Sequence, residues 1–313
     1  MPPVVETFYR GTIYSTIKGS FQGFPLKGSM STPRNNSGQS FGSSRSAQGP
    51  RSYPSILPQE WYDVFFKKAD LDAAYDLLVG RPRHFLIEAT RGHVRSLQLR
   101  FDEAWEHLDR AVDMSEEAEE TIPNLVRRFL LEITRFETAL FETPVHPSTE
   151  FLSLEMPQVD PAVFSEYPEV KQVLDKRKVC EGKLLLHLGK CEEAAAIFED
   201  LKEQNPSTTP EALAVYYLNL GACQHSMGLF EEAQRNLENA EFAVAAIETR
   251  LNAVRVGSTL HTFFYFMGDG EKAAEWLAYV QRLDCPQKTK DLFVKIGKRL
   301  YERCLEHSRL VAW

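Results

Sequence analysis

The chain has 313 residues, of which 43% are hydrophobic and 26% are charged, and its net charge is −8. It contains no run of about 18 apolar residues, which argues against a membrane span. Residues 1–51 carry six basic residues and one acidic residue, so removing their charge of +5 from −8 leaves −13 for the remaining chain. An acidic body argues against nucleic-acid binding, which needs Lys and Arg to neutralise phosphates.

Residues 1–55 are rich in Ser, Gly, Pro and Asn and show no helical period, so we expect a disordered basic tail. Three interpretations of this tail stay open. It is a flexible extension, an organelle transit peptide, or a fusion or mis-assigned start before Met30. The N-terminus has no apolar core of a secretory signal, and five dispersed cysteines without CxxC spacing favour a reducing compartment. We therefore expect a cytoplasmic protein, or an organelle protein if the tail is a transit peptide.

From residue 56 onward, apolar residues recur every three or four positions, which predicts helices, and no alternating pattern predicts a strand. In region 56–142, the N-terminal hairpins, we predict helices at Gln59–Lys68, Leu71–Val79, Arg83–Leu97, Asp102–Met114 and Ile122–Phe141. Region 143–167 is rich in proline and is predicted to be an irregular insert. In region 168–313 we predict helices at Glu169–Leu188, Glu192–Glu203, Pro210–Met227, Phe230–Ala245, Glu248–Phe266, Gly270–Arg282 and Gln287–His307.

One spacing recurs along these helices: a small residue, a turn glycine seven positions later, an alanine twelve positions later and a large apolar residue sixteen positions later. The three clearest copies are Gly182, Gly189, Ala194 and Phe198; Gly221, Gly228, Ala233 and Leu237; and His261, Gly268, Ala273 and Leu277, with histidine in the first position. An earlier copy has Gly92, Ala104 and Leu108 without the turn glycine, and a fainter one has Tyr62, Ala74 and Leu78.

This spacing has a physical interpretation. Two antiparallel helices approach closely where both carry small residues, so Gly182 and Ala194 are expected to face each other. The glycines between them permit the turn. The large apolar residues, such as Phe198, are expected to fill the space toward the next hairpin. Each hairpin would leave one apolar face open, so neighbouring hairpins must stack to cover it. A non-repeating helical bundle is the alternative.

On these residues the chain resembles the tetratricopeptide repeat (TPR) family. The resemblance lies in Gly182–Pro206 and Leu220–Ala240, and more weakly in Phe263–Pro286 and Arg91–Ala111, about half of the chain. It implies an all-α fold of tandem antiparallel helical hairpins stacked as a TPR-like solenoid. The repeats are 39 and 40 residues apart, against about 34 in the family, which predicts longer helices or longer turns between hairpins. The last helix, polar on one face, would cap the array.

The resemblance also implies a binding surface, because the first helix of each hairpin in that family lines a concave groove that holds peptides or partner helices. Carried over to this sequence, the groove residues are Lys176, Lys183, His187, Asn219, His225, Arg255 and Thr262. Val179 and Lys183 stand where the carboxylate-clamp subgroup of the family has Lys and Asn. This difference argues against an adaptor for C-terminal carboxylates, although the basic groove residues would favour a partner with an acidic segment.

No catalytic motif is evident: HExxH, GxGxxG, P-loop and GxSxG are all missing from the sequence. His187 and Cys191 are four residues apart, a spacing that can place two metal ligands on one helix face. Gly189 is predicted to break the helix between them, so we expect a groove histidine and a buried thiol instead. These observations predict no enzyme activity, no metal and no cofactor, although an enzyme with an unrecognised site stays an alternative.

The leading hypothesis is therefore a non-enzymatic scaffold or adaptor that holds a partner protein or peptide in the groove of a TPR-like array. The alternative is a regulatory protein that senses a ligand or peptide in the same groove. The two hypotheses differ in the size of the occupant, and the sequence alone does not separate them.

Overall fold

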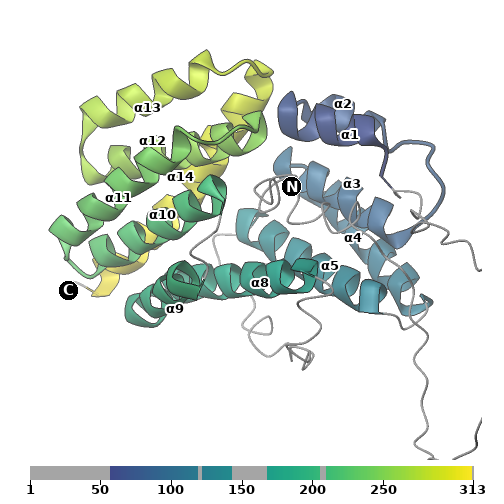
Figure 1. The fold of residues 1–313 in the computed structure, drawn as a ribbon, viewed down its shortest axis with the longest axis horizontal. Coiled ribbons are helices and arrows are strands. Elements are labelled where there is room, and N and C mark those ends of the chain that lie inside the picture. Colours follow the sequence, from purple (N-terminus) through teal and green to yellow (C-terminus); the bar gives the residue numbers. More distant parts are fainter. Residues whose placement is uncertain (1–56, 119–121, 143–167, 205–208, 312–313) are drawn as a thin grey trace, which may run out of the picture.

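The computed structural model describes residues 57–118, 122–142, 168–204 and 209–311. These residues form twelve α-helices and one π-helix without a strand, and the helices pack as sequential adjacent pairs (Figure 1). The predicted tail at 1–55 and the predicted insert at 143–167 lie outside the described residues. Within the described residues, no helix is both long enough and apolar enough to cross a bilayer.

The helices begin and end within four residues of their predicted limits. In the N-terminal region they are α1 (Gln59–Tyr62), the π-helix η3 (Asp63–Lys67), α2 (Leu71–Asp76), α3 (Phe85–Leu97), α4 (Phe101–Glu116) and α5 (Ile122–Glu142). In the C-terminal region they are α8 (Pro168–His187), α9 (Cys191–Gln204), α10 (Pro210–Ser226), α11 (Phe230–Val244), α12 (Arg250–Met267), α13 (Gly270–Arg282) and α14 (Gln287–Val311). The π-helix was not predicted, and it continues α1 directly.

The turn between the two helices of a hairpin has the same backbone conformation in all five copies. The residue seven positions after the first small site has a positive φ angle at Ala69, Leu99, Gly189, Gly228 and Gly268, between 53° and 81°. The next amide then donates to a carbonyl of the preceding helix; Lys190 donates to Leu185, for example, with an N–O distance of 2.9 Å. This is the Schellman closure of a helix C-terminus in four of the copies, whereas in the first copy, which follows the π-helix, Asp70 donates to Val64, six positions back. The first two hairpins therefore share the turn although they lack its glycine.

The helices of each pair meet where small residues were predicted, but the contact differs from expectation. A methyl group built on Gly182 would lie 2.7 Å from the ring of Phe198. One built on Gly92 would lie 2.7 Å from the Leu108 side chain and 3.0 Å from the Ala104 carbonyl oxygen. The large residue sixteen positions on therefore covers the glycine itself, within the hairpin, instead of only filling space toward the next hairpin.

In the last copy the two helices of the hairpin also meet at the first position, although a histidine stands there in place of glycine. There the His261 ring nitrogen Nδ1 donates a hydrogen bond to the Ala273 carbonyl oxygen at 2.8 Å, twelve positions on. In the Gly221 copy, the corresponding carbonyl of Ala233 would lie 3.3 Å from an added methyl group. A hydrogen bond thus takes the place of close packing in this hairpin.

We expect alanine substitutions at two of these glycines to have different effects. In an exposed helix, Gly→Ala stabilises by roughly 0.5–1 kcal/mol. At Gly182 the new methyl group would overlap the fully buried Phe198 ring, so Gly182→Ala should destabilise by about 1–3 kcal/mol. At Gly221 the closest atom, Leu237 Cγ, is 3.2 Å away, so Gly221→Ala should be nearly neutral. Urea unfolding followed by circular dichroism measures both, and equal effects would contradict the assigned contact.

The array closes on itself, because the first hairpin packs against the last. Helix η3 contacts α12, and Trp61 and Phe65 share a hydrophobic core with Phe293 and Ile296 of α14. The Thr289 hydroxyl at the start of α14 donates a buried hydrogen bond of 2.8 Å to the carbonyl of Ala69, the residue with positive φ in the turn of the first hairpin. Figure 1 shows α1 and α2 beside the end of α13, which places the two ends of the array next to each other.

The final helix does more than the predicted cap. Helix α14 packs along α12 and also contacts α5, α8 and α10, the helices on the inner side of the array. Its close approach to α12 depends on Gly297, where an added methyl group would lie 2.8 Å from the Thr262 hydroxyl oxygen. The face that the family resemblance predicted to be an open groove is therefore partly covered by the protein's own C-terminal helix.

Candidate binding pocket between the inner helices and α14

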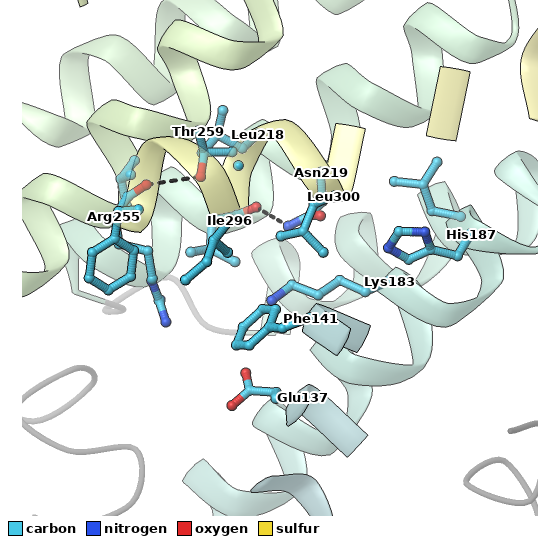
Figure 2. A pocket seen from close by; sticks show the side chains of 15 residues that line it. Glu137, Phe141, Lys183, His187, Leu218, Asn219, Arg255, Thr259, Ile296 and Leu300 are labelled. Carbon is cyan, nitrogen blue, oxygen red and sulfur yellow. Dashed lines mark hydrogen bonds between the residues drawn. The ribbon is translucent and has the colours of Figure 1, made fainter. Parts of the chain in front are cut away.

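The coverage of the inner face by α14 leaves a pocket with about 850 Å³ of space between atoms, part of which is open to solvent. Figure 2 shows its lining side chains, which come from α5, α8, α10, α12 and α14. The lining is mostly apolar, with a few polar and charged groups. The lining residues are Glu137, Phe141, Lys183, Leu186, His187, Val215, Leu218, Asn219, Arg255, Val256, Thr259, Phe293, Ile296, Gly297 and Leu300.

The structure brings four of the seven predicted groove residues together in this pocket: Lys183, His187, Asn219 and Arg255. They come from the first helices of three successive hairpins, α8, α10 and α12. The other three lie elsewhere. Lys176 is two turns earlier on α8 and forms an ion pair, Thr262 is buried beneath α14, and His225 packs against the rings of Phe230 and Phe263.

The carboxylate of Glu137 interacts with several positively charged side chains at one end of the pocket. Glu137 on α5 is only 7% exposed, and its Oε2 atom lies 3.3 Å from the ammonium of Lys176. Burial alone would raise the pKa of this carboxyl. The positive charges of Lys176, Lys183 and Arg255 act in the opposite direction and lower the pKa of Glu137 to about 2. The side chain therefore stays ionised inside the protein.

Two side chains that interact with Glu137, His93 and Lys183, have charged forms that burial disfavours. Burial lowers the pKa of His93 to about 4, although the negative charge of Glu137 opposes the shift, so the imidazole is neutral at pH 7. Burial also lowers the pKa of Lys183, and Glu137 opposes that shift too. The cluster thus joins Lys176, Lys183 and Arg255 to the Glu137 carboxylate and a neutral histidine.

Two polar side chains of the pocket are bonded to their own helices. The Asn219 amide donates to the Val215 carbonyl at 2.7 Å, and the Thr259 hydroxyl donates to the Arg255 carbonyl at 2.9 Å; both bonds are drawn in Figure 2. The other polar groups of the lining include the charged heads of Lys183 and Arg255 and the ring of His187. Figure 2 shows these heads approaching the same region as the Glu137 carboxylate.

Sequence reasoning missed Glu137 and Phe141 on α5 and the α14 side of the pocket. A signal for Glu137 existed, because Ile133 and Leu140 are buried four positions before it and three after it, on the same helix face. An acidic residue on an apolar face is uncommon and points to a buried ionic contact. The position of α14 had no comparable signal, because it depends on contacts with five helices far apart in the sequence.

A second polar cluster has the geometry of a hydroxyl–imidazole–carboxylate chain. The Tyr75 hydroxyl lies 2.9 Å from His107 Nε2, and His107 Nδ1 lies 2.7 Å from Glu88 Oε2. The Arg95 guanidinium covers the Tyr75 ring at 3.4 Å, and His107 is 9% exposed. Substrate access to this chain is therefore poor, and we interpret it as a contact that joins the first two hairpins.

The histidine and cysteine that are four residues apart are separated as predicted. Helix α8 ends at His187, Gly189 follows with φ of +75°, and Cys191 begins the next helix. His187 lines the pocket, whereas the Cys191 thiol is half-buried instead of buried as predicted, and this partial burial raises its pKa. Among the described residues, no group of three or more His, Cys, Asp or Glu side chains is arranged to hold a metal ion.

The scan of protein-family models and the searches of curated proteins and of solved structures found no match for this chain.

Proposed function

We propose that this protein is a non-enzymatic, TPR-like interaction scaffold that holds a segment of a partner protein at the inner-face pocket. The repeated turn and the repeated glycine contact support the resemblance to stacked hairpin arrays. Arrays of this kind present a curved surface on which several hairpins contribute to one binding site. The partner segment would lie between α14 and the first helices of the last three hairpins.

One observation carries this proposal: Lys183, Asn219 and Arg255 come from three successive hairpins and line the same pocket. A side-chain set spread over 72 positions of sequence becomes a single surface only because the hairpins stack in register. The mixture of apolar walls with a few polar and charged groups is that of a recognition site. The cytoplasmic location and the acidic character of the partner belong to the same proposal.

Affinity capture with the full chain tests the scaffold hypothesis. Thr259 lines the pocket, so Thr259→Phe should fill part of it and reduce recovery of a specific partner at least tenfold. Thr259→Val keeps the side-chain shape and removes only the hydroxyl, so it serves as the matched control and should recover the partner at close to the wild-type level. Circular dichroism establishes that both variants are folded.

Two outcomes would contradict the proposal. Recovery of the same partners by both variants would place the binding surface elsewhere on the array. The second is failure to recover any partner that binds the purified wild-type chain directly, which would remove the scaffold role itself.

A further inference from the structure

One lysine of α8 differs from the other three lysines of that helix in what its side chain contacts. Lys171, Lys176 and Lys178 each pair with a carboxylate, at N–O distances of 2.8, 3.3 and 2.8 Å. Lys183 forms no hydrogen bond and no ion pair of this kind with the described residues, and it lines the inner-face pocket. The amine of this lysine is therefore accessible to a molecule that enters the pocket.

The helical period directs the Lys183 side chain into the pocket. Leu186 and His187 follow it by three and four positions, so the three residues lie on one face of α8, and all of them line the pocket. Figure 2 shows the Lys183 side chain extended into the pocket toward the ring of Phe141. The amine thus ends beside an apolar wall instead of at the outer surface of the hairpin.

This position makes the amine of Lys183 more reactive than that of a surface lysine. Burial lowers its pKa, the negative charge of Glu137 opposes the shift, and the positive charges of Arg255 and Lys176 add to it. The pKa of the buried Cys180 thiol, one turn earlier, is raised to about 12, so this neighbour is uncharged at pH 7. More of Lys183 is therefore present as the free amine, the form that attacks electrophiles.

The walls of the pocket favour an apolar electrophile. Phe141, Leu218 and Ile296 are among the apolar lining residues. The polar side chains of Asn219 and Thr259 are already bonded to their own helices, at 2.7 and 2.9 Å. An apolar molecule would cover these walls and gain hydrophobic free energy, whereas a strongly hydrated one would lose its water without replacement. The space of about 850 Å³, partly open to solvent, suits a small molecule.

We propose that Lys183 captures a small apolar aldehyde in this pocket as a reversible imine. The amine lone pair attacks the carbonyl carbon and forms a C–N bond, the nitrogen gives up its two protons, and the carbonyl oxygen leaves with them as water. The exchange needs no oxidant, reductant or further reactant, and hydrolysis returns both partners. Apolar walls that exclude water favour the imine. The capture is stoichiometric and goes beyond the scaffold role.

Reductive trapping with the full chain provides the test. The probe is hexanal with sodium cyanoborohydride, which converts an imine into a stable secondary amine that peptide mapping by mass spectrometry locates. We expect labelling at Lys183 to exceed labelling at Lys178 by roughly tenfold or more at pH 7, and to reach half of its maximum at a lower pH. Excess 1-hexanol, which has the same tail without a carbonyl group, should reduce labelling at Lys183 alone. Glyoxylate, a charged and hydrated aldehyde, should label the two lysines alike.

Two variants and an unfolded control separate the pocket from general lysine reactivity. Lys183→Arg keeps a positive charge and removes the amine, so the intact mass should show loss of the preferred label. Lys178→Arg removes a lysine of the same helix that pairs with Asp200 outside the pocket, and should leave labelling at Lys183 unchanged. The wild-type chain in urea should label its lysines evenly, because the preference depends on the folded pocket.

Two results would overturn the inference: equal labelling of Lys183 and Lys178 in the folded wild-type chain, or labelling of Lys183 that 1-hexanol does not reduce. Both are measured on the wild-type chain, so they decide the question even if Lys183→Arg folds poorly. Even labelling would leave the scaffold role standing, because partner capture does not require an imine. Selective labelling of Lys183 in a chain that captures no partner would keep the aldehyde site and remove the scaffold role.

Discussion

Replacing Ala194 by Asp should destabilise the protein by roughly 3–5 kcal/mol, the largest effect we expect from a single substitution. Ala194 lies in the first turn of the second helix of its hairpin, is fully buried, and its amide donates to the Lys190 carbonyl at 3.0 Å. A carboxylate at this site would be enclosed by the close contact between α8 and α9. A buried charge without a partner is among the few mechanisms that cost this much.

The same helix offers the control for this experiment. Ala196 lies two positions further along α9 and is exposed, so Ala196→Asp introduces the same side chain where water can solvate it. We expect that variant to remain within about 0.5 kcal/mol of wild type. Chemical denaturation followed by circular dichroism compares the two. Similar free energies of unfolding for Ala194→Asp and Ala196→Asp would exclude close helix packing at Ala194.

The second large effect is the dependence of stability on pH. The pKa of His93 is lowered by burial from an ordinary 6.5 to about 4, so the unfolded chain binds this proton more readily than the folded protein does. The contribution of neutral His93 to the free energy of unfolding is therefore fully present above pH 6.5 and is lost as the pH falls toward 4. The pKa of Glu137 is lowered from 4.5 to about 2, so its contribution is lost as the pH falls through that lower window. Each shift corresponds to a loss on the order of 3 kcal/mol.

Substitutions at His93 and Glu137 test whether each residue causes the loss of stability in its own pH range. His93→Asn should reduce the slope in unfolding free energy between pH 6.5 and 4, to which His84 and His225 also contribute because burial lowers their pKa values. Glu137→Gln should destabilise at pH 7, because it removes the carboxylate of the buried ion pair with Lys176, and should reduce the slope between pH 4.5 and 2. Glu132→Gln is the matched control on α5, since Glu132 is one-third exposed and its Arg135 pair is at the surface. An unchanged pH profile in His93→Asn would contradict the assignment.

Helix positions and hairpin pairing could be predicted because they depend on local spacing. The offsets of seven, twelve and sixteen residues specify a turn, a close contact and a large side chain over it. The structure confirms the turn in all three later hairpins, the contact twelve positions on at Gly221 and His261, and the covering side chain at Gly182 and Gly221. The turns at Ala69 and Leu99 have the same left-handed conformation, yet no glycine marks them. Surrounding packing therefore imposes a conformation that the residue type alone disfavours.

The pocket was harder to predict, for a reason that follows from its construction. The family resemblance located the first helices of the hairpins, and four predicted residues do line the pocket. It gave no indication that α14 covers this face, nor that Glu137 contributes from α5. Both features depend on contacts between residues more than 100 positions apart, such as the hydrogen bond from Arg299 on α14 to the carbonyl of Phe141 on α5. A repeat pattern in the sequence indicates only the contacts within a hairpin and between neighbouring hairpins.

The contact between the first and last hairpins limits how this fold can change its length. In an open array, another hairpin can be duplicated or deleted at little cost, because only nearest neighbours are affected. Here an inserted hairpin would separate Thr289 from the Ala69 carbonyl and divide the core that they adjoin. Gain or loss of one unit would thus require a new closure, so the number of hairpins is set by geometry and the sequence can diverge only within that number.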